Sequence, residues 1–271
     1  MSERRHKARG HFDFLTDALY ATLRALGRRA MGFYTAFGIF LVVGIVVAVA
    51  GTFAFAKLAG DVRSGSTQAF DDSVMTWLGT HRIAWVERSL LEITALGTGL
   101  VVLTIVGVAA LFLALTQHRY SAFLLLLATG GGIVLNSILK LTFARPRPQA
   151  FTWVTHASSS SFPSGHAMSS AIVYFTVAYL AARLEPRVWQ RALTMFVALA
   201  LVALICISRL YLGVHYPSDV LAGVIIGLAW AGFCMAGLEA ARVLSERFRQ
   251  PMEDAERDLS TAERRAAGLT E

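Results

Sequence analysis

Six long apolar runs constrain what this sequence can fold into. A helix needs about 17–25 mainly apolar residues to cross a bilayer, and inside the bilayer its backbone polar groups are satisfied within the helix itself. The predicted spans are residues 31–56, 95–115, 121–139, 167–182, 192–207 and 220–238. The fourth and fifth runs are short, so we expect them to extend into their polar flanks. The sequence predicts an all-α, polytopic membrane protein with six transmembrane helices.

The composition agrees with a membrane protein and argues against a nucleic-acid-binding one. Charged residues make up 16% of the chain, against about 25% in soluble domains. The net charge of +7 comes mostly from residues beside the apolar runs, where basic side chains meet anionic headgroups and set topology. Cys206 and Cys234 lie inside apolar runs. We expect both to be small core residues, with no disulfide or metal site.

The charges of the connecting segments predict the orientation of the spans. The N-terminal arm (1–30) and the turn 183–191 are basic, and the C-terminal tail (241–271) begins with Arg242, Arg247 and Arg249, so all three segments are expected on the cytoplasmic side. The arm is either an amphipathic helix on the membrane surface or a solvated lead into the first span. The tail is expected to be a solvated helix or disordered. The domain between them, 31–240, holds all six spans, and its first run is too long for a cleaved signal peptide.

The segment 57–94 is near neutral to acidic and is expected on the outer side. Phe70, Val74, Trp77 and Leu78 recur at helical spacing and predict an amphipathic helix at the membrane interface. We interpret Asp71 and its neighbour Asp72 as an acidic pair in the first turn of that helix, rather than as metal ligands.

The first of three polar clusters ends the third apolar run. Lys140 lies one helical turn after Asn136, so both side chains are expected to face the bundle. Two prolines stop the helix and hold Arg145 and Arg147 in an extended segment. Basic residues at the end of a span also snorkel to the interface, but this loop is expected outside, where the positive-inside rule disfavours them.

The second cluster, Ser161-Phe-Pro-Ser-Gly-His166, opens the fourth run. Ser164 is a candidate N-cap, and Gly165 allows an anion to approach the backbone. Free N–H groups and the helix dipole favour an anion there. His166 would lie one residue inside that site. By itself the Ser-Gly pair is an ordinary helix start.

The third cluster joins the fifth and sixth runs. Ser208 and Arg209 close the fifth run, and His215 precedes a proline suited to the first turn of the sixth. Asp219 lies four residues after His215, within reach across that turn. By topology, all three clusters are expected at the same face of the membrane. Charged groups at membrane depth cost about 2.5–3.5 kcal/mol each on insertion scales, so they are usually functional.

These residue types fit the binding of a phosphate group and its transfer. Lys140, Arg147 and Arg209, with the Ser164 hydroxyl and the backbone at Gly165, are candidate ligands for a phosphate dianion. His215 is the candidate nucleophile, and Asp219 would fix its tautomer. His166 would protonate the leaving oxygen. No carboxylate cluster predicts a metal, and no cofactor is expected.

The three clusters resemble the motifs of the type-2 phosphatidic acid phosphatase family, which shares its site with vanadium-dependent haloperoxidases. The matching positions are Lys140 with Arg147-Pro148, then Pro163 to His166, then Ser208-Arg209 with His215 and Asp219. The resemblance implies an acid phosphatase/haloperoxidase-like bundle. It also implies a metal-independent reaction through a phosphohistidine, a site on the extracytoplasmic face, and Ser208 among the phosphate-binding residues. Arg145 lies outside the strict pattern, and its role stays open.

The sequence therefore predicts an integral membrane lipid phosphatase. The family implies substrates such as phosphatidic acid, phosphatidylglycerol phosphate or undecaprenyl diphosphate, and the sequence does not choose among them. The expected location is a bacterial inner membrane, with both termini cytoplasmic. The alternatives are a membrane phosphotransferase with a lipid or sugar acceptor, and a non-catalytic anion transporter. Membrane lipids are expected partners, and nucleic acids are not.

Overall fold

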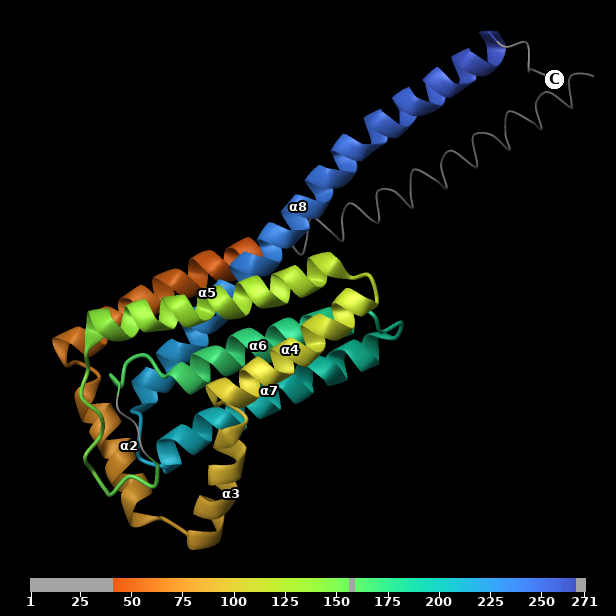
Figure 1. Cartoon of the computed structure of the whole chain (residues 1–271). Coiled ribbons are helices and arrows are strands. Elements are labelled where there is room, and N and C mark those ends of the chain that lie inside the picture. The colour runs from red at the N-terminus through yellow and green to blue at the C-terminus, as the bar shows by residue number, and fades with distance from the viewer. Residues whose placement is uncertain (1–40, 156–158, 267–271) are drawn as a thin grey trace, which may run out of the picture.

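The protein is helical throughout the part of the chain that the computed structural model describes, residues 41–155 and 159–266. The helices are Leu41–Ser64, α2 (Gln68–Thr80), α3 (Ala84–Ala95), α4 (Gly99–Leu115), α5 (Arg119–Phe143), α6 (Gly165–Ala182), α7 (Val188–Tyr211) and α8 (Pro217–Ala266). Figure 1 shows the long helices as one bundle. The predicted all-α membrane fold is confirmed. The N-terminal arm (1–30) and the start of the first predicted span lie outside the described residues.

Five helices in the described ranges are long and apolar enough to cross a membrane. They are Leu41–Ser64, α5, α6, α7 and the Pro217–Ala241 part of α8. The second predicted span, 95–115, is broken, because α3 and α4 qualify only together and are bent by 45°. The apolar run from residue 95 contains Gly97 and Gly99, and the helix restarts at Gly99. The fourth and fifth spans extend into their flanks as predicted, and the first continues past residue 56 to Ser64.

Helix α6 forms the centre of the bundle and packs against α4, α5, α7 and α8. Small residues allow its close approach to α8. A Cβ atom added at Gly227 of α8 would lie 2.8 Å from the backbone oxygen of Met168 in α6. Without a strong hydrophobic drive between helices in lipid, such small-residue contacts hold transmembrane helices together. The contact also fixes where the first turns of α6 and α8 lie relative to each other.

Helices α2 and α3 project beside the ends of α7 and α8 (Figure 1). The Tyr211 hydroxyl of α7 accepts a hydrogen bond from the N–H of Ile83 at 2.7 Å. The predicted amphipathic helix is therefore present as α2, with Phe70 and Trp77 exposed. Asp71 does lie in its first turn, but its side chain is fully buried. The Asp71 side chain therefore faces the bundle rather than solvent. The interpretation of Asp71 and Asp72 as an acidic pair of the first turn did not predict this burial.

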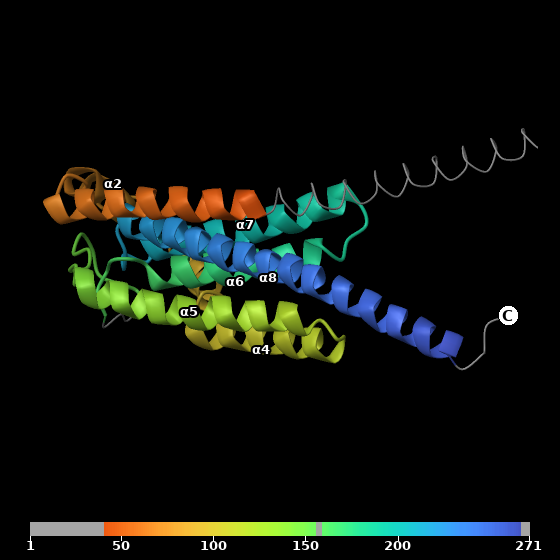
Figure 2. The ribbon, with the colours of Figure 1, turned by 90° about the horizontal axis from the view of Figure 1, so that it is seen from above.

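Helix α8 continues far beyond its membrane-spanning part. It runs unbroken from Pro217 to Ala266, and Figures 1 and 2 both show the second half projecting away from the bundle. Of the two alternatives for the tail, the structure favours a helix. Cys206 and Cys234 are both free thiols, with Cys234 buried and Cys206 partly buried.

The α6–α8 contact predicts a stability difference between two glycines of one helix. Gly227→Ala places a methyl group against the α6 backbone and is expected to destabilise the fold by about 1–3 kcal/mol. Gly237→Ala is the matched control, since nothing lies within 4 Å of its added Cβ and alanine has the higher helix propensity. Thermal unfolding of the purified variants in detergent measures both. Equal melting temperatures for the two variants would contradict the close packing.

Candidate functional site

The three polar clusters meet where α5 ends and α6 and α8 begin. Backbone hydrogen bonds join them: the Ser161 N–H donates to the Arg145 carbonyl at 2.9 Å, and the Ser164 N–H donates to the Asp219 carbonyl at 3.0 Å. The third residue of α8 is thereby tied to the residue preceding α6. The predicted convergence on one end of the bundle is confirmed.

The loop after α5 folds back over the end of its own helix. Ala144 adopts a left-handed conformation with φ 42° and ends the helix. Lys140 Nζ donates to the Ser159 hydroxyl and to the Ser160 carbonyl, both at 2.9 Å. Arg147 Nε donates to the Ser159 carbonyl at 3.0 Å. Lys140 and Arg147 thus hold the same short segment, Ser159 and Ser160.

His215 lies in the short connection between α7 and α8 and is 2% exposed. The preceding turn requires a glycine, because Gly213 has φ +79° and an added Cβ would lie 2.5 Å from the Phe151 ring. Arg147 Nη1 lies 3.2 Å from His215 Nε2. A guanidinium only donates hydrogen bonds, so Nε2 accepts and the ring proton is on Nδ1. This is the tautomer expected of a nucleophile that attacks through Nε2.

Asp219 lies behind His215, but it is held mainly by other groups. Its Oδ2 is 3.7 Å from His215 Nδ1, longer than a hydrogen bond. Oδ2 accepts the Tyr216 N–H at 2.9 Å and the Ser161 hydroxyl. Oδ1 accepts Arg145 Nη1 at 2.6 Å. The predicted pairing of Asp219 with His215 is thus a close approach rather than a hydrogen bond in this structure.

Arg145, whose role the motif left open, is the main partner of Asp219. Its second nitrogen, Nη2, donates to Asp71 Oδ2 at 2.9 Å and to Gln68 Oε1 at 3.0 Å. Burial acts to lower the pKa of Arg145, but the charges and hydrogen bonds of Asp219 and Asp71 outweigh it and raise the pKa. Sequence analysis missed Asp71 as a partner. The sequence contains no local signal for this contact, because Arg147 and Arg209 also lie at the ends of spans and are held by carbonyl and hydroxyl oxygens instead.

The start of α6 offers unpaired polar groups. Ser164 is the N-cap residue, as predicted, and its buried hydroxyl has no hydrogen-bond partner among the described residues. A Cβ added at Gly165 would lie 3.2 Å from Asn136 Nδ2 and 3.5 Å from Lys140 Cε. Asn136 and Lys140 thus both face the bundle, as expected. His166 follows in the first turn, where Arg209, His215, Lys140 and Arg147 all act on its ring electrostatically.

Arg209 and Ser208 differ in the hydrogen bonds that their side chains make. Arg209 is 4% exposed, and its Nη1 donates to the Thr94 hydroxyl of α3 at 2.8 Å. The Ser208 hydroxyl is fully buried and donates to the Ile205 carbonyl of its own helix at 2.6 Å. The role of Ser208 in phosphate binding stays a prediction, and in this structure its hydroxyl proton is donated to α7.

The charges of the site favour an anion. Within the described residues, neither Lys140, Arg147 nor Arg209 has a carboxylate within ion-pair distance, while Asp219 and Asp71 are taken up by Arg145. Burial lowers the pKa of Arg147. Burial also lowers the pKa of His215 to about 4, against the opposing effect of Asp219. His215 is therefore neutral near pH 7 and lies beside the buried Arg147. Arg209 is also buried, and Lys140 is half-buried.

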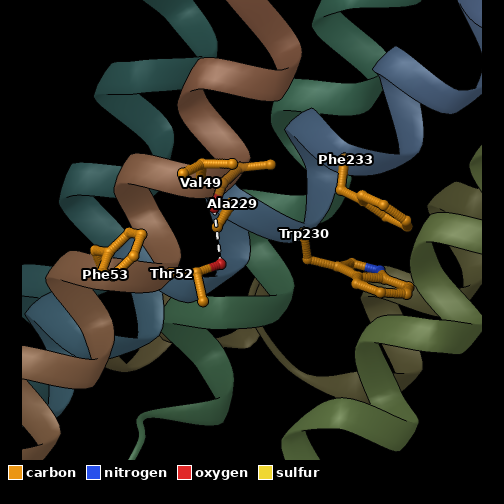
Figure 3. A pocket seen from close by; sticks show the side chains of 7 residues that line it. Val49, Thr52, Phe53, Ala229, Trp230 and Phe233 are labelled. Atoms are coloured by element: carbon orange, nitrogen blue, oxygen red, sulfur yellow. Dashed lines mark hydrogen bonds between the residues drawn. The ribbon is translucent and has the colours of Figure 1, made fainter.

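The apolar grooves of the protein lie elsewhere. Figure 3 shows one of about 400 Å³, between Val49, Thr52 and Phe53 of the first described helix and Ala229, Trp230 and Phe233 of α8. Its only hydroxyl among these, on Thr52, donates to the Ala48 carbonyl at 2.7 Å. A second groove of about 580 Å³ shares Trp230 and Phe233 and continues along α5. Both grooves have apolar walls, which suit the hydrocarbon tail of a lipid rather than a reacting group.

Comparisons with known proteins agree with this geometry. A sequence model of the PAP2 superfamily matches residues 119–242. Phosphatidylglycerophosphatase B of Bacillus subtilis is 32% identical over 175 residues, which cover 64% of this chain and 86% of that protein. The undecaprenyl-diphosphatase of Sulfolobus acidocaldarius is 31% identical over 140 residues, covering 50% of this chain and 63% of that protein.

A solved structure extends the likeness to three dimensions. The crystal structure of a transmembrane PAP2-type phosphatidylglycerolphosphate phosphatase from Bacillus subtilis superposes with a TM-score of 0.68 at 30% identity, covering 73% of this chain and 98% of that one. With this match in fold and in sequence, the chain belongs to the PAP2 superfamily and is an integral membrane phosphatase.

Proposed function

We propose that the protein removes a phosphate group from a membrane lipid, either a monoester such as phosphatidylglycerol phosphate or a diphosphate such as undecaprenyl diphosphate. The observation that carries the proposal is the contact between Arg147 and a neutral, Nδ1-protonated His215 inside a group of unpaired cations. The names of the relatives support a lipid phosphate as substrate. Apolar grooves beside α8 suit a substrate whose tails stay in the bilayer.

In this proposal Lys140, Arg147 and Arg209 bind the phosphate. Arg147 and Arg209 supply planar pairs of donors, and Lys140 supplies a point charge. The unpaired Arg209 Nε and Ser164 hydroxyl are further donors directed at the same anion. A phosphate that enters would draw Arg147 Nη1 away from His215 Nε2, which frees that lone pair. The cations then stabilise the charge that spreads over the equatorial oxygens during transfer.

The reaction would run in two displacements. His215 Nε2 attacks phosphorus, the bond from phosphorus to the leaving oxygen breaks, and His166 gives that oxygen a proton. A phosphohistidine forms, and Asp219 stabilises the positive ring. His166, now deprotonated, takes a proton from water as the water attacks phosphorus. The P–N bond then breaks, phosphate leaves, and both histidines return to their starting state.

We place the site on the extracytoplasmic face. The basic turn 183–191 and the start of the tail, with Arg242, Arg247 and Arg249, follow spans at the end of the bundle opposite His215, and the positive-inside rule assigns that end to the cytoplasm. Helices α2 and α3, which flank the site, would then lie at the outer interface, where exposed aromatic residues such as Trp77 and Trp85 are favoured.

The first test is phosphate release from a panel of lipid mono- and diphosphates. Purified protein in EDTA is expected to release phosphate without any added acceptor, and His215→Ala is expected to lower kcat by about 10³-fold or more, as for the loss of other nucleophiles. His118→Ala, an exposed histidine at the other end of α5, is the matched control and should equal wild type. Loss of release in EDTA, or full activity of His215→Ala, would refute the proposal.

The pH dependence provides a second test. Because the pKa of His215 is lowered to about 4, the ring stays neutral as the pH falls through 6.5, the ordinary value for histidine. The fall in kcat/KM at low pH that comes from protonation of His215 is therefore expected near pH 4. Two substrates with different phosphate pKa values separate the ionisation of the substrate from that of the enzyme. A common limb near pH 6.5 for both would contradict a buried, neutral His215.

Sidedness provides a third test, by labelling single cysteines in intact cells with a membrane-impermeant thiol reagent. With Cys206 and Cys234 replaced by alanine, Ser66→Cys in the exposed segment before α2 is expected to react. Ser245→Cys in the tail is the matched control and should react only after the cells are permeabilised. The reverse pattern would place the site on the cytoplasmic face.

A further inference from the structure

A buried network of charges lies behind the candidate nucleophile and extends beyond the three motifs. Arg145 is its centre, with Nη1 directed at Asp219 Oδ1 (2.6 Å) and Nη2 at Asp71 Oδ2 (2.9 Å). The guanidinium also lies over the ring of Tyr216, 4.4 Å from its centroid. Both carboxylates are fully buried. One cation thus bridges an acid of α8 and an acid of α2, which are far apart in the sequence.

Asp71 also binds the first turn of α8. Its Oδ1 accepts the Ser218 N–H at 3.0 Å, and its Oδ2 accepts the Ser218 hydroxyl. That hydroxyl accepts Arg145 Nη1 at 2.8 Å. A carboxylate at this place satisfies a free N–H group of the helix terminus. Asp71 therefore helps to fix the turn that carries His215 and Asp219.

Stability alone is a poor explanation for this network. Buried ion pairs often stabilise a fold no better than apolar residues of similar volume, because the charges lose their hydration. The network holds two carboxylates against one guanidinium, so its charge is negative overall. Asp71 offsets part of the positive charge of Arg145. Arg145 therefore neutralises the negative charge of Asp219 less. This charge acts on His215 Nδ1, which lies 3.7 Å from Asp219 Oδ2.

We propose that Asp71 and Arg145 are positioning residues that act on His215 through Asp219. Arg145 fixes the Asp219 carboxylate, and Asp71 keeps Arg145 from neutralising it. The stabilised state is the positive imidazole ring formed when Nε2 bonds to phosphorus. The inference rests on the proposed function, and it assigns to α2 a part in the chemistry that the three motifs do not contain.

The test compares two neighbouring aspartates of α2. Asp71→Asn keeps the shape and removes the charge. We expect kcat to fall about 10- to 100-fold, the range known for groups that orient a reactive ligand from behind, while KM changes less than about 3-fold, since Asp71 does not touch the phosphate. Rapid-quench measurement should show slower formation of the phosphoenzyme. Asp72→Asn is the matched control, because Asp72 is exposed, and it should equal wild type.

A second variant separates the effect of the Asp71 charge from the effect of its hydrogen bonds to the first turn of α8. Ser218→Ala removes the hydroxyl that binds Asp71 and Arg145 but leaves all the charges, so its kcat should stay within about 3-fold of wild type. If Asp71→Asn does not fold, Arg145→Lys takes its place. It keeps the charge but lacks the fork that bridges two carboxylates, and the same loss of kcat at constant KM is expected.

Three results would overturn the inference while leaving phosphatase activity in place. They are wild-type kcat in Asp71→Asn, wild-type kcat in Arg145→Lys, and a loss in Ser218→Ala as large as that in Asp71→Asn. Absence of phosphate release from the wild-type protein would instead overturn the proposed function itself. The two failures are therefore distinguishable in one set of assays.

Discussion

The structure depends on burying two arginines fully and one lysine in part, with no carboxylate of the described residues within ion-pair distance of any of the three. Lys140, Arg147 and Arg209 come from the ends of two helices and from one loop, and carbonyl or hydroxyl oxygens hold each of them. Neutral oxygens compensate a buried charge only in part. Binding of an anion would supply the negative charge that compensates the rest of these buried positive charges. The most direct interpretation of the site is therefore a preformed receptor for a doubly charged phosphate.

The topology of the bundle explains why such distant residues can meet. Helices α5 and α7 end on the side of the bundle where α6 and α8 begin. Each cluster follows or precedes a span at that side, so helix ends supply the charges and helix starts supply free N–H groups. The close contact at Gly227 holds the starts of α6 and α8 together. The proposed phosphate site is thus a consequence of how four helix ends are packed.

Sequence reasoning was most successful where a local pattern decides the structure. The apolar runs predicted the spans, and the motif spacings predicted the contact of Arg147 with His215. It failed where the outcome depends on contacts between distant segments. The apolar periodicity of α2 predicted an interfacial helix from residues such as Phe70 and Trp77, which are exposed. It gave no indication that Asp71 is buried. No local signal shows that Arg145 bridges an acid of α2 to an acid of α8.

Ser208 belongs to a recognised motif, and its chemical role stays a prediction. A serine in the last turns of a helix can donate its proton to a carbonyl three or four residues earlier. Ser208 does so with Ile205, and its neighbour Arg209 alone faces the cluster. Conversely, Asp71 belongs to no motif, yet it contacts the turn on which the candidate nucleophile depends. Motif membership and chemical role are therefore separate properties in this site.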